Sequence, residues 1–374
     1  MPQSHVFVFL EIFTCEGGIQ SYVKDVLQAY ATLKGANADV FLLRDCAVEN
    51  PLESSRLRFH HIKSSSKTSS AMIGRVKLTI ALLAHLLRHR PTRVFCGHIH
   101  LAPLIQALCA PLNIPYTILT YGKEVWEPLP PRKQNALQHA DRIWTISRYS
   151  RDRLCAANRI NIDRVDLLFC SIDGSKFYPQ AKDSELVERY KLADTNVLMT
   201  VARLWSGDPY KGVDVTIRAL STIAQSFPTV KYLVIGRGDD QPRLAQLAAE
   251  LGVRDRVIFA GFVPTEELPK HYNLADAYVM PSQEGFGIVY LEAMACGVPV
   301  VSGDADGSAD PLQDGVFGWR VPYRDETEVA IACIEILKSK ASIEPRCDRA
   351  WLREQSLAIF GKSAFRDRVK DLIQ

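Results

Sequence analysis

Long apolar runs are missing from this sequence. No stretch reaches the roughly 18 consecutive apolar residues of a membrane-spanning helix, so none is predicted. The nine cysteines are scattered and form no Cys-x-x-Cys pair, which fits a reducing cytosol better than a disulfide framework or a zinc site. A signal peptide is not indicated either, because the apolar run His5–Leu10 follows no basic residues and is interrupted by Glu11. We therefore expect a cytoplasmic protein.

A large excess of one charge is also lacking. The 45 basic and 42 acidic residues leave a net charge of +3, which argues against a dedicated nucleic-acid binder. The distribution is nevertheless uneven. Up to Phe177 there are 22 basic and 14 acidic residues, whereas the remainder has 23 and 28. The basic excess therefore belongs to the first half of the chain.

Acidic residues are absent altogether from Ser54 to Lys123, where ten Lys or Arg occur. Within this stretch, Ala71–Arg88 has a helical pattern with basic residues among many apolar ones. A basic, apolar helix beside a basic loop suits an anionic membrane face, where each nearby Lys or Arg adds about 1 kcal/mol. The alternative is a core helix with a solvated basic edge. The membrane interpretation uses the basic residues from Arg56 to Arg93 and would place the protein on the inner face of the membrane.

The length of 374 residues suggests two domains. Short apolar runs alternate with helical patterns such as Val213–Gln225 and Gln241–Leu251, and several runs are continuous, as in strands buried on both faces of a parallel sheet. We expect two doubly wound α/β domains, with ligands beyond the carboxyl ends of the strands. The predicted strands are His5–Leu10, Asp39–Leu43, Arg93–Cys96, Tyr116–Thr120, Arg142–Ile146, Asp166–Phe169, Asn196–Val201, Lys231–Ile235, Val257–Ala260, Ala277–Met280 and Pro299–Ser302.

Two glycines, Gly17 and Gly18, follow the first predicted strand and open a helix. They allow a ligand to approach the backbone, and the start of the helix offers free N–H groups to an anion. A purely structural turn is an equally good interpretation of this pattern on its own.

Two cations flank another strand-to-helix crossing. Arg203 follows the strand that ends at Val201, and Lys211 precedes the next helix. Together they can clamp a diphosphate, the guanidinium as a fork and the ammonium as a point charge. Ordinary surface positions are the alternative. Gly236-Arg237-Gly238 also follows a strand, but Gln241 stands where the third glycine of the dinucleotide fingerprint belongs, so NAD is not indicated.

The most informative segment runs from Pro281 to Val301. A strand delivers Glu284, a glycine-rich turn at Gly285–Gly287 starts a helix, and Glu292 follows eight residues after Glu284, near the same helical face. Carboxylates accept pairs of sugar hydroxyls, and N–H groups at a helix start bind phosphate. Glu292 as a helix surface charge is the alternative, but its apolar helix favours a buried carboxylate with a function.

This segment resembles the E-x7-E signature of retaining GT-B glycosyltransferases of family 4. Other pieces resemble the family in the same order: Gly17–Gln20, His98–His100, Thr145–Ser147, Ile172–Phe177, Val201–Leu204 with Lys211-Gly212, and Asp314–Trp319. The resemblance covers nearly the whole chain. It implies the GT-B architecture, in which two Rossmann-like domains face a central cleft. On this basis residues 1–177 form an acceptor domain, residues 178–350 a nucleotide-sugar domain, and residues 351–374 a helix that returns to the first domain.

The resemblance also implies a role for each site residue. Glu292 binds the donor ribose and Glu284 lies beside the donor sugar, while Arg203 and Lys211 neutralise the leaving diphosphate. His100 lies beside the reacting sugar, and His98 is structural. The implied catalytic set is therefore His100, Glu284, Arg203 and Lys211. The implied donor-binding set is Gly17, Gly18, Arg203, Lys211, Gly236, Val263, Glu284, Gly285, Phe286, Gly287, Ile288 and Glu292.

The chain departs from the family pattern at three places. The interval between Arg203 and Lys211 is longer than usual. Asp310 stands near the position of a usual Glu that follows Gly-Gly. Tyr121-Gly122 occupies the place of a usual His-Gly. The first departure bears on the role of Lys211, the second shortens the reach of a carboxylate, and the third suggests a different acceptor side.

We expect no metal and no cofactor beside the nucleotide sugar. Asp304-Ala305-Asp306 looks like a metal-binding D-x-D, but that motif belongs to a different, single-sheet glycosyltransferase fold. The calcium-loop interpretation fails because Gly315 occupies its twelfth position. Cationic side chains and helix N-termini supply the charge instead.

The expected function is that of a retaining, metal-independent hexosyltransferase. It moves a sugar from a UDP- or GDP-linked donor to a glycan or lipid-linked acceptor, in polysaccharide or glycolipid biosynthesis. Two alternatives remain: a nucleotide-sugar epimerase on the same fold, which turns over donor without acceptor, and a non-catalytic protein that binds the donor only.

Overall fold

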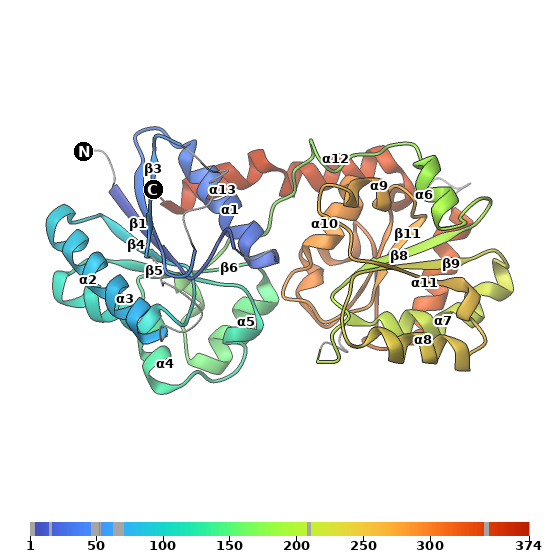
Figure 1. Cartoon of the computed structure of the whole chain (residues 1–374), viewed down its shortest axis with the longest axis horizontal. Helices are drawn as coiled ribbons and strands as arrows, with labels where there is room; N and C mark the ends of the chain where they lie inside the picture. Colours follow the sequence, from blue (N-terminus) through green and yellow to red (C-terminus); the bar gives the residue numbers. More distant parts are fainter. Residues whose placement is uncertain are drawn as a thin grey trace. The chain divides into compact units, whose positions relative to one another are not determined.

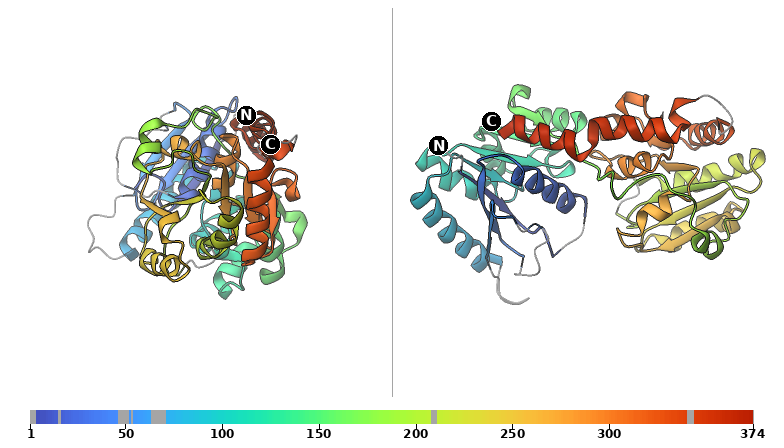
Figure 2. Two further views of the ribbon diagram at one scale, coloured as in Figure 1. Left: turned by 90° about the vertical axis from the view of Figure 1, so that its right-hand side faces the viewer. Right: turned by 90° about the horizontal axis from the view of Figure 1, so that it is seen from above.

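A computed structural model describes residues 4–14, 17–45, 52, 54–62, 71–207, 211–339 and 344–373. The chain divides into two compact units, one of residues 1–170 with 365–374 and the other of residues 171–364. Each contains one parallel β-sheet with helices on both faces (Figures 1 and 2). The predicted fold class, two doubly wound parallel-sheet domains, is confirmed.

The first unit has seven strands in the order β3-β2-β1-β4-β5-β6-β7. The strands are β1 (Ser4–Phe9), β2 (Asn37–Leu42), β3 (Leu57–His61), β4 (Arg93–Cys96), β5 (Tyr116–Thr120), β6 (Arg142–Thr145) and β7 (Val165–Leu167). The α-helices are α1 (Gly18–Ala31), α2 (Ala71–His89), α3 (Ala102–Cys109), α4 (Pro131–Gln138), α5 (Arg148–Asn158) and the end of α13 (Lys362–Ile373).

Both faces of this sheet are covered by apolar side chains. On one face Phe7 stacks on Phe95 with ring centroids 4.5 Å apart. On the other, Leu78, Leu82 and Leu86 of α2 are fully buried in a cluster with residues of α3, α4 and α5. These leucines recur every four residues, so one stripe of α2 faces the core. The continuous apolar strands of the sequence are explained by this two-sided burial.

The second unit has six strands in the order β10-β9-β8-β11-β12-β13. The strands are β8 (Val197–Val201), β9 (Lys231–Ile235), β10 (Val257–Gly261), β11 (Ala277–Met280), β12 (Val300–Gly303) and β13 (Trp319–Val321). The α-helices are α6 (Ser184–Arg189), α7 (Val213–Ser226), α8 (Gln241–Glu250), α9 (Leu268–Tyr272), α10 (Ile288–Ala295), α11 (Glu326–Lys338), α12 (Arg349–Phe360) and the start of α13.

Each sheet reverses its strand order at one place. In the first unit the reversal lies between β1 and β4, and in the second between β8 and β11. The loops that leave the carboxyl ends of two such strands turn to opposite faces, which opens a crevice for ligands between them. The loops after β1, β4, β8 and β11 are therefore the places to look for a site.

The unit boundaries differ from those expected at 177 and 350. The segment after Ser171 packs on the second unit: Ile172 bridges Gly361, and Arg353 donates to the carbonyls of Gly174 and Phe177 at 2.7 and 2.6 Å. The expected single terminal helix is two helices, since α12 ends at Phe360 and packs with α10 in the second unit. Only the part of α13 from Phe365 onward belongs to the first unit.

Two strands were missing from the prediction. β3 reads Leu-Arg-Phe-His-His and lies at the edge of its sheet, where charged and polar side chains reach solvent. β13 has three residues and is also an edge strand. Neither has the continuous apolar run by which the central strands were found.

Among the described residues, no helix combines the length and the apolar character needed to cross a bilayer.

A buried carboxylate fixes the loop between β1 and α1. Asp45 is 1% exposed and accepts the backbone N–H groups of Ile12, Phe13 and Thr14 at 2.5, 3.2 and 3.0 Å. The Thr14 hydroxyl donates to it at 2.7 Å. This loop leads to the glycines at the start of α1, so its shape depends on one side chain from the loop after β2.

We predict that Asp45→Ala lowers the free energy of unfolding by about 2 kcal/mol or more, because three backbone donors lose their acceptor. Urea denaturation measures this. Asp152→Ala, at a position whose side chain is 60% exposed, is the matched control and should leave the midpoint within error of the parent. Equal midpoints for both variants would contradict this account of the loop.

Candidate functional site

The site in the second unit is built from the loops after two neighbouring strands. β8 pairs with β11, and these are the strands at which the order reverses. The loop after β8 leads into α7, and the loop after β11 leads into α10. The sequence-predicted residues Arg203 and Lys211 lie on the first loop, and Glu284 and Gly285–Gly287 on the second.

Both helices begin at a glycine in the left-handed backbone region. Gly212 has φ +73° and Gly287 has φ +86°. A Cβ on Gly212 would lie 2.5 Å from the carbonyl oxygen of Pro281, so only glycine lets the two loops approach so closely. No side chain caps either helix start. The first-turn N–H groups of α7 and α10 are thus not engaged by a capping side chain, an arrangement suited to binding an anion.

Lys211 and Glu284 form an ion pair between the Lys211 Nζ and the Glu284 Oε1. The two side chains are only 20% and 16% exposed, so the pair is largely withdrawn from water. Each charge depends on the other, because a partly buried charge without a partner is strongly unfavourable. The longer interval between Arg203 and Lys211 therefore does not prevent Lys211 from reaching the site. Asp208, Pro209 and Tyr210 of that interval lie outside the described residues.

Asp306 holds the backbone of Glu284 in place. Its Oδ2 accepts the Glu284 N–H at 2.5 Å, and its Oδ1 accepts the Ser308 N–H at 2.8 Å. Gly307 N–H donates to the Glu284 carbonyl at 2.9 Å. Burial raises the pKa of Asp306 to about 6, against the lowering effect of these hydrogen bonds. The Asp304-Ala305-Asp306 segment thus contains a positioning residue that sequence reasoning missed.

Glu292 lies on α10 and has a strongly altered acidity. Burial raises its pKa to about 7, and the hydroxyl of Tyr272, which donates to Oε2 at 2.6 Å, partly offsets this. The expectation of a withdrawn carboxylate is supported by this environment. Tyr272 was not foreseen as its partner. It is fully buried and comes from α9, twenty residues earlier.

Arg203 and Lys211 line the same pocket, together with Gly212 and Asp240. Arg203 is exposed, and its guanidinium carbon lies 5.1 Å from the centre of the Trp205 ring. The structure therefore brings the two predicted cations together at the start of α7, with Glu284 in contact with one of them.

Gly236 and Val263 follow β9 and β10. The Gly236 N–H donates to the carbonyl of Gly261 at 2.8 Å, and Val263 is buried. Next to them the guanidinium carbon of Arg237 lies 4.7 Å from the ring centre of Phe262, which is 53% exposed. An exposed aromatic ring beside a cation offers a stacking surface for a planar ligand.

Phe286 and Ile288 contribute little side-chain surface to this site. Phe286 is 1% exposed and packs edge-on against Phe360 at 5.9 Å between ring centres. Its side chain belongs to the core of the second unit, so only its backbone is placed to meet a ligand. Ile288 is the first residue of α10 and is half-buried.

In the first unit the predicted residues lie on the loops after β1 and β4, the strands at its own reversal. Gly17 and Gly18 are exposed at the start of α1, whose first turn has no side-chain cap. Glu16 lies outside the described residues. His98 Nδ1 accepts the backbone N–H of His100 at 3.1 Å, while the His100 side chain is exposed. This geometry agrees with a structural His98 and leaves His100 accessible.

Both histidines are held neutral near pH 7. Burial lowers the pKa of His98 to about 4, and burial followed by the charge of Lys133 lowers that of His100. Tyr121, at the place of the family's His, is buried and donates to the Gly97 carbonyl at 2.7 Å. It thereby anchors the loop that carries His98. Glu124 accepts the Tyr121 N–H at 2.5 Å.

Comparison with known proteins bears directly on the second unit. Residues 195–339 match the family described as glycosyl transferases group 1. This range contains every predicted site residue from Arg203 to Glu292.

Two curated relatives show the extent of the likeness. A GDP-mannose-dependent alpha-(1-6)-phosphatidylinositol monomannoside mannosyltransferase of Mycolicibacterium smegmatis is 35% identical over 231 residues, which cover 58% of this chain and 59% of that protein. The chain thus spans about three fifths of this relative's length. A GDP-mannose-dependent monoacylated alpha-(1-6)-phosphatidylinositol monomannoside mannosyltransferase of Corynebacterium glutamicum is 28% identical over 335 residues, 86% of this chain and 85% of that protein.

A solved structure extends the likeness to the whole fold. The crystal structure of Anabaena HepE in complex with UDP and glucose covers 99% of both chains with a TM-score of 0.78 at 19% sequence identity. The predicted resemblance is therefore confirmed. Residues 195–339 are thus similar to the glycosyl transferases group 1 family, and the fold of the chain is that of the GT-B glycosyltransferases.

Proposed function

We propose that this protein is a glycosyltransferase that moves a hexose from a nucleotide-diphosphate sugar to a lipid-linked or glycan acceptor, with retention of the anomeric configuration. The observation that carries the proposal is the Lys211–Glu284 ion pair, which lies between two uncapped helix starts at the strand reversal of the second unit. This is where an anionic, sugar-bearing ligand finds both positive charge and a carboxylate.

In this proposal the positive groups of the site bind the diphosphate of the donor. Arg203, Lys211 and the start of α7 line one pocket and supply positive potential to it. The loop that leads into α10 adjoins them through the contact between Lys211 and Glu284. As the bond between the sugar carbon and the phosphate oxygen breaks, negative charge grows on the leaving diphosphate, and preorganised donors stabilise it. The acceptor oxygen forms the new bond, and its proton passes to the leaving phosphate. The charge that a metal ion supplies in other enzymes is, in this proposal, provided by the chain itself.

Glu292 fits the ribose of the donor. A carboxylate accepts two adjacent hydroxyl groups, and the bond from Tyr272 to Oε2 leaves Oε1 for that purpose. Because its pKa is about 7, Glu292 is half-ionised at neutral pH. Hydroxyl donors favour the ionised form, so donor binding releases a proton from this residue.

We propose GDP-mannose as the donor and a phosphatidylinositol mannoside as the acceptor class. The names of both curated relatives contain GDP-mannose and a phosphatidylinositol monomannoside. The hollow beside Gly238, lined by Arg203, Trp205 and Arg237, offers aromatic and cationic surfaces for a purine base.

A membrane-resident acceptor also explains the surface of α2. Opposite its buried leucines, α2 exposes a second apolar stripe formed by Val76, Ile80, Leu83 and Leu87, which are 52, 64, 38 and 53% exposed. Exposed basic residues on the same helix include Arg75, Lys77 and Arg88. Lys63 and Lys67 of the acid-free stretch lie outside the described residues. We propose that this stripe lies on an anionic membrane surface at the inner face.

Transfer should depend on both cations. We predict that Lys211→Met and Arg203→Ala each lower kcat by about a hundredfold or more, because the leaving diphosphate loses a preorganised positive group. GDP release from GDP-mannose in the presence of a phosphatidylinositol mannoside measures this. Arg218→Ala, on the exposed face of α7, should retain full turnover. Undiminished kcat in both cation variants would refute the site, and sugar conversion without acceptor would favour an epimerase.

The pKa of Glu292 makes donor affinity depend on pH. We predict that GDP binding tightens from pH 6 to pH 8, as Glu292 ionises with a pKa of about 7, and that Glu292→Gln removes this dependence and weakens binding at pH 8. Isothermal titration calorimetry with GDP measures both. Glu250→Gln, exposed on α8, is the control. A parent affinity that does not change over this range would contradict the assignment.

The same residue should make the folded protein less stable at higher pH. In the unfolded chain Glu292 ionises near its ordinary 4.5, but in the folded protein near 7, so its contribution to stability falls by about 3 kcal/mol as pH rises between these values. Thermal unfolding of Glu292→Gln against the parent at pH 8 therefore serves as an internal check: the variant should be the more stable of the two while binding GDP less well.

The apolar stripe of α2 is tested with vesicles. We predict that the protein sediments with phosphatidylglycerol-containing vesicles at low salt and is released at high salt, because screening weakens the basic attraction. Ile80→Asn with Leu87→Asn should abolish sedimentation. Ile331→Asn, at a 51% exposed position on α11, is the matched control. Absence of sedimentation by the parent at low salt would exclude the membrane surface as a partner.

A further inference from the structure

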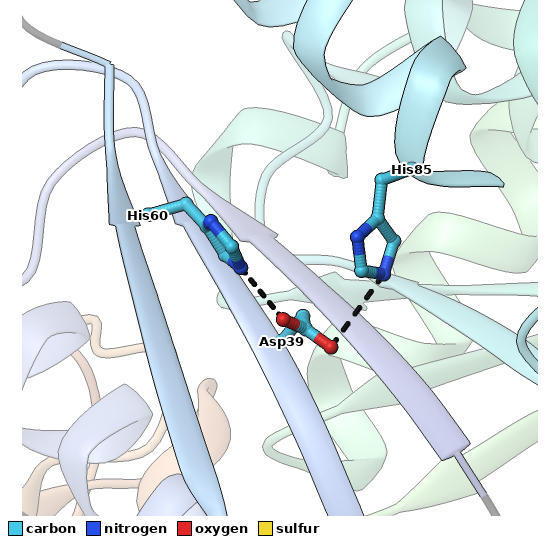
Figure 3. A group of neighbouring side chains, drawn as sticks. All are labelled: Asp39, His60 and His85. Atoms are coloured by element: carbon cyan, nitrogen blue, oxygen red, sulfur yellow. Dashed lines mark hydrogen bonds and ion pairs between the residues drawn. The ribbon is translucent and has the colours of Figure 1, made fainter. Parts of the chain in front are cut away.

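Three side chains from separate elements of the first unit converge on one point, away from the loops discussed above. Asp39 lies in β2, His60 in β3 and His85 in α2. Figure 3 shows the two imidazole rings directed at the Asp39 carboxylate from opposite sides. The three potential ligand atoms all lie within 4.8 Å of one another.

The two oxygens of Asp39 face different histidines. Oδ1 lies 2.6 Å from His60 Nε2, a normal hydrogen-bond distance, whereas Oδ2 lies 3.5 Å from His85 Nε2 (Figure 3). The second distance is too long for a good hydrogen bond. The His85 side chain is only 9% exposed, and its Nε2 is buried without a hydrogen-bond partner among the described residues.

A buried nitrogen without a partner is unfavourable by about 1–3 kcal/mol, and native structures rarely keep one without a reason. Here the nitrogen is aimed at a carboxylate oxygen that it does not reach. A cation placed between these atoms satisfies the imidazole lone pair and the carboxylate at once. The orientation of both rings through Nε2 is the orientation in which histidine commonly binds metals.

We propose that Asp39, His60 and His85 form a binding site for a divalent first-row transition metal, with Zn²⁺ as the preferred ion. Two imidazoles and one carboxylate are a common protein ligand set for zinc, and water or a further side chain completes the coordination. Zinc holds such atoms at about 2.0–2.2 Å, so the ligands of one ion lie about 3–4 Å apart. Against these values His60 Nε2 and Asp39 Oδ1, which lie 2.6 Å apart, must separate slightly, and ligand atoms up to 4.8 Å apart must approach by about 1 Å.

The surroundings favour an ordered site. His60 stacks on Phe41 at 4.5 Å between ring centres, and His85 meets the same ring edge-on at 5.3 Å. One aromatic side chain thus orients both histidines. His89 follows His85 by one helical turn, with its ring centre 4.5 Å away, and is the nearest candidate for a fourth ligand. Arg58, two residues before His60, is exposed, so water screens its positive charge.

The consequence of such a site is structural. It joins the edge strand β3, its neighbour β2 and helix α2. In the sequence these three elements are separated by long connections. A metal that binds the folded chain and not the unfolded one raises stability by mass action. The proposal therefore concerns the anchoring of α2 and is independent of donor binding in the second unit.

The test uses the full chain after removal of metals with EDTA. We expect calorimetry to show one Zn²⁺ per chain, a rise of Tm on zinc addition, and visible absorption when Co²⁺ replaces Zn²⁺. Asp39→Asn and His85→Gln should each weaken Zn²⁺ binding by more than about tenfold, since loss of an outer-shell partner alone costs about 10–100-fold. His139→Gln removes an exposed histidine directly after α4 and should change nothing.

Folding is checked separately by circular dichroism of each variant in EDTA. Asp39→Asn keeps the shape of the side chain, so it remains informative if His85→Gln does not fold. Either of two results overturns the proposal: no Zn²⁺ or Co²⁺ binding by the parent, or the same affinity and stoichiometry in Asp39→Asn as in the parent. GDP affinity should be unaffected throughout, which separates this outcome from any failure of the proposed transferase activity.

Discussion

The contact between Lys211 and Glu284 is the interaction on which the proposed donor site depends. It joins the loop after β8 to the loop after β11, at the point where the strand order of the second sheet reverses. An ion pair that is mostly withdrawn from water holds its partners in a narrow range of positions, because separation would leave each charge poorly solvated. The glycines that begin α7 and α10 allow this closeness, since a side chain at Gly212 would collide with the other loop. The ion pair, the two glycine helix starts and the reversal of strand order therefore lie at the same point of the second unit.

Glu292 shows how a functional group is kept at the expense of stability. Burial raises the pKa of Glu292, which lies beside Tyr272, to about 7. The ionised form, which in our proposal binds the ribose, is therefore the form that burial destabilises. An apolar residue would pack there without this penalty. In the proposed donor site the hydroxyl groups of a ribose would compensate this carboxylate, in addition to the hydrogen bond from Tyr272. Asp306 shows the opposite use of a carboxylate, because its oxygens are already taken by backbone N–H groups around Glu284.

The sequence predicted those features that depend on neighbouring residues. The central strands were found from their apolar runs, and Glu284 and Glu292 from their spacing around the glycine turn. β3 and β13 were missed because β3 contains Arg58 and ends in two histidines, and β13 has only three residues, so neither has such a run. Asp306 and Tyr272 act through hydrogen bonds to residues about twenty positions away, and no local pattern indicates such a partner. The same reason applies to Asp39, His60 and His85, which we propose as metal ligands: they span 46 positions and meet only when the sheet and α2 pack together, whereas the expectation of no zinc site rested on the cysteines.

Helix α2 brings together the two proposals that concern the first unit. Its buried stripe of Leu78, Leu82 and Leu86 is ordinary core, but its opposite stripe leaves four large apolar side chains in water. His85 lies beside the buried stripe and is tied to β2 and β3 through Asp39 and His60. A metal at the proposed site would fasten α2 to β2 and β3 on its buried side, opposite the exposed apolar stripe. The proposed metal site would thus hold in place the helix that we propose to meet the membrane, without taking part in the proposed transfer.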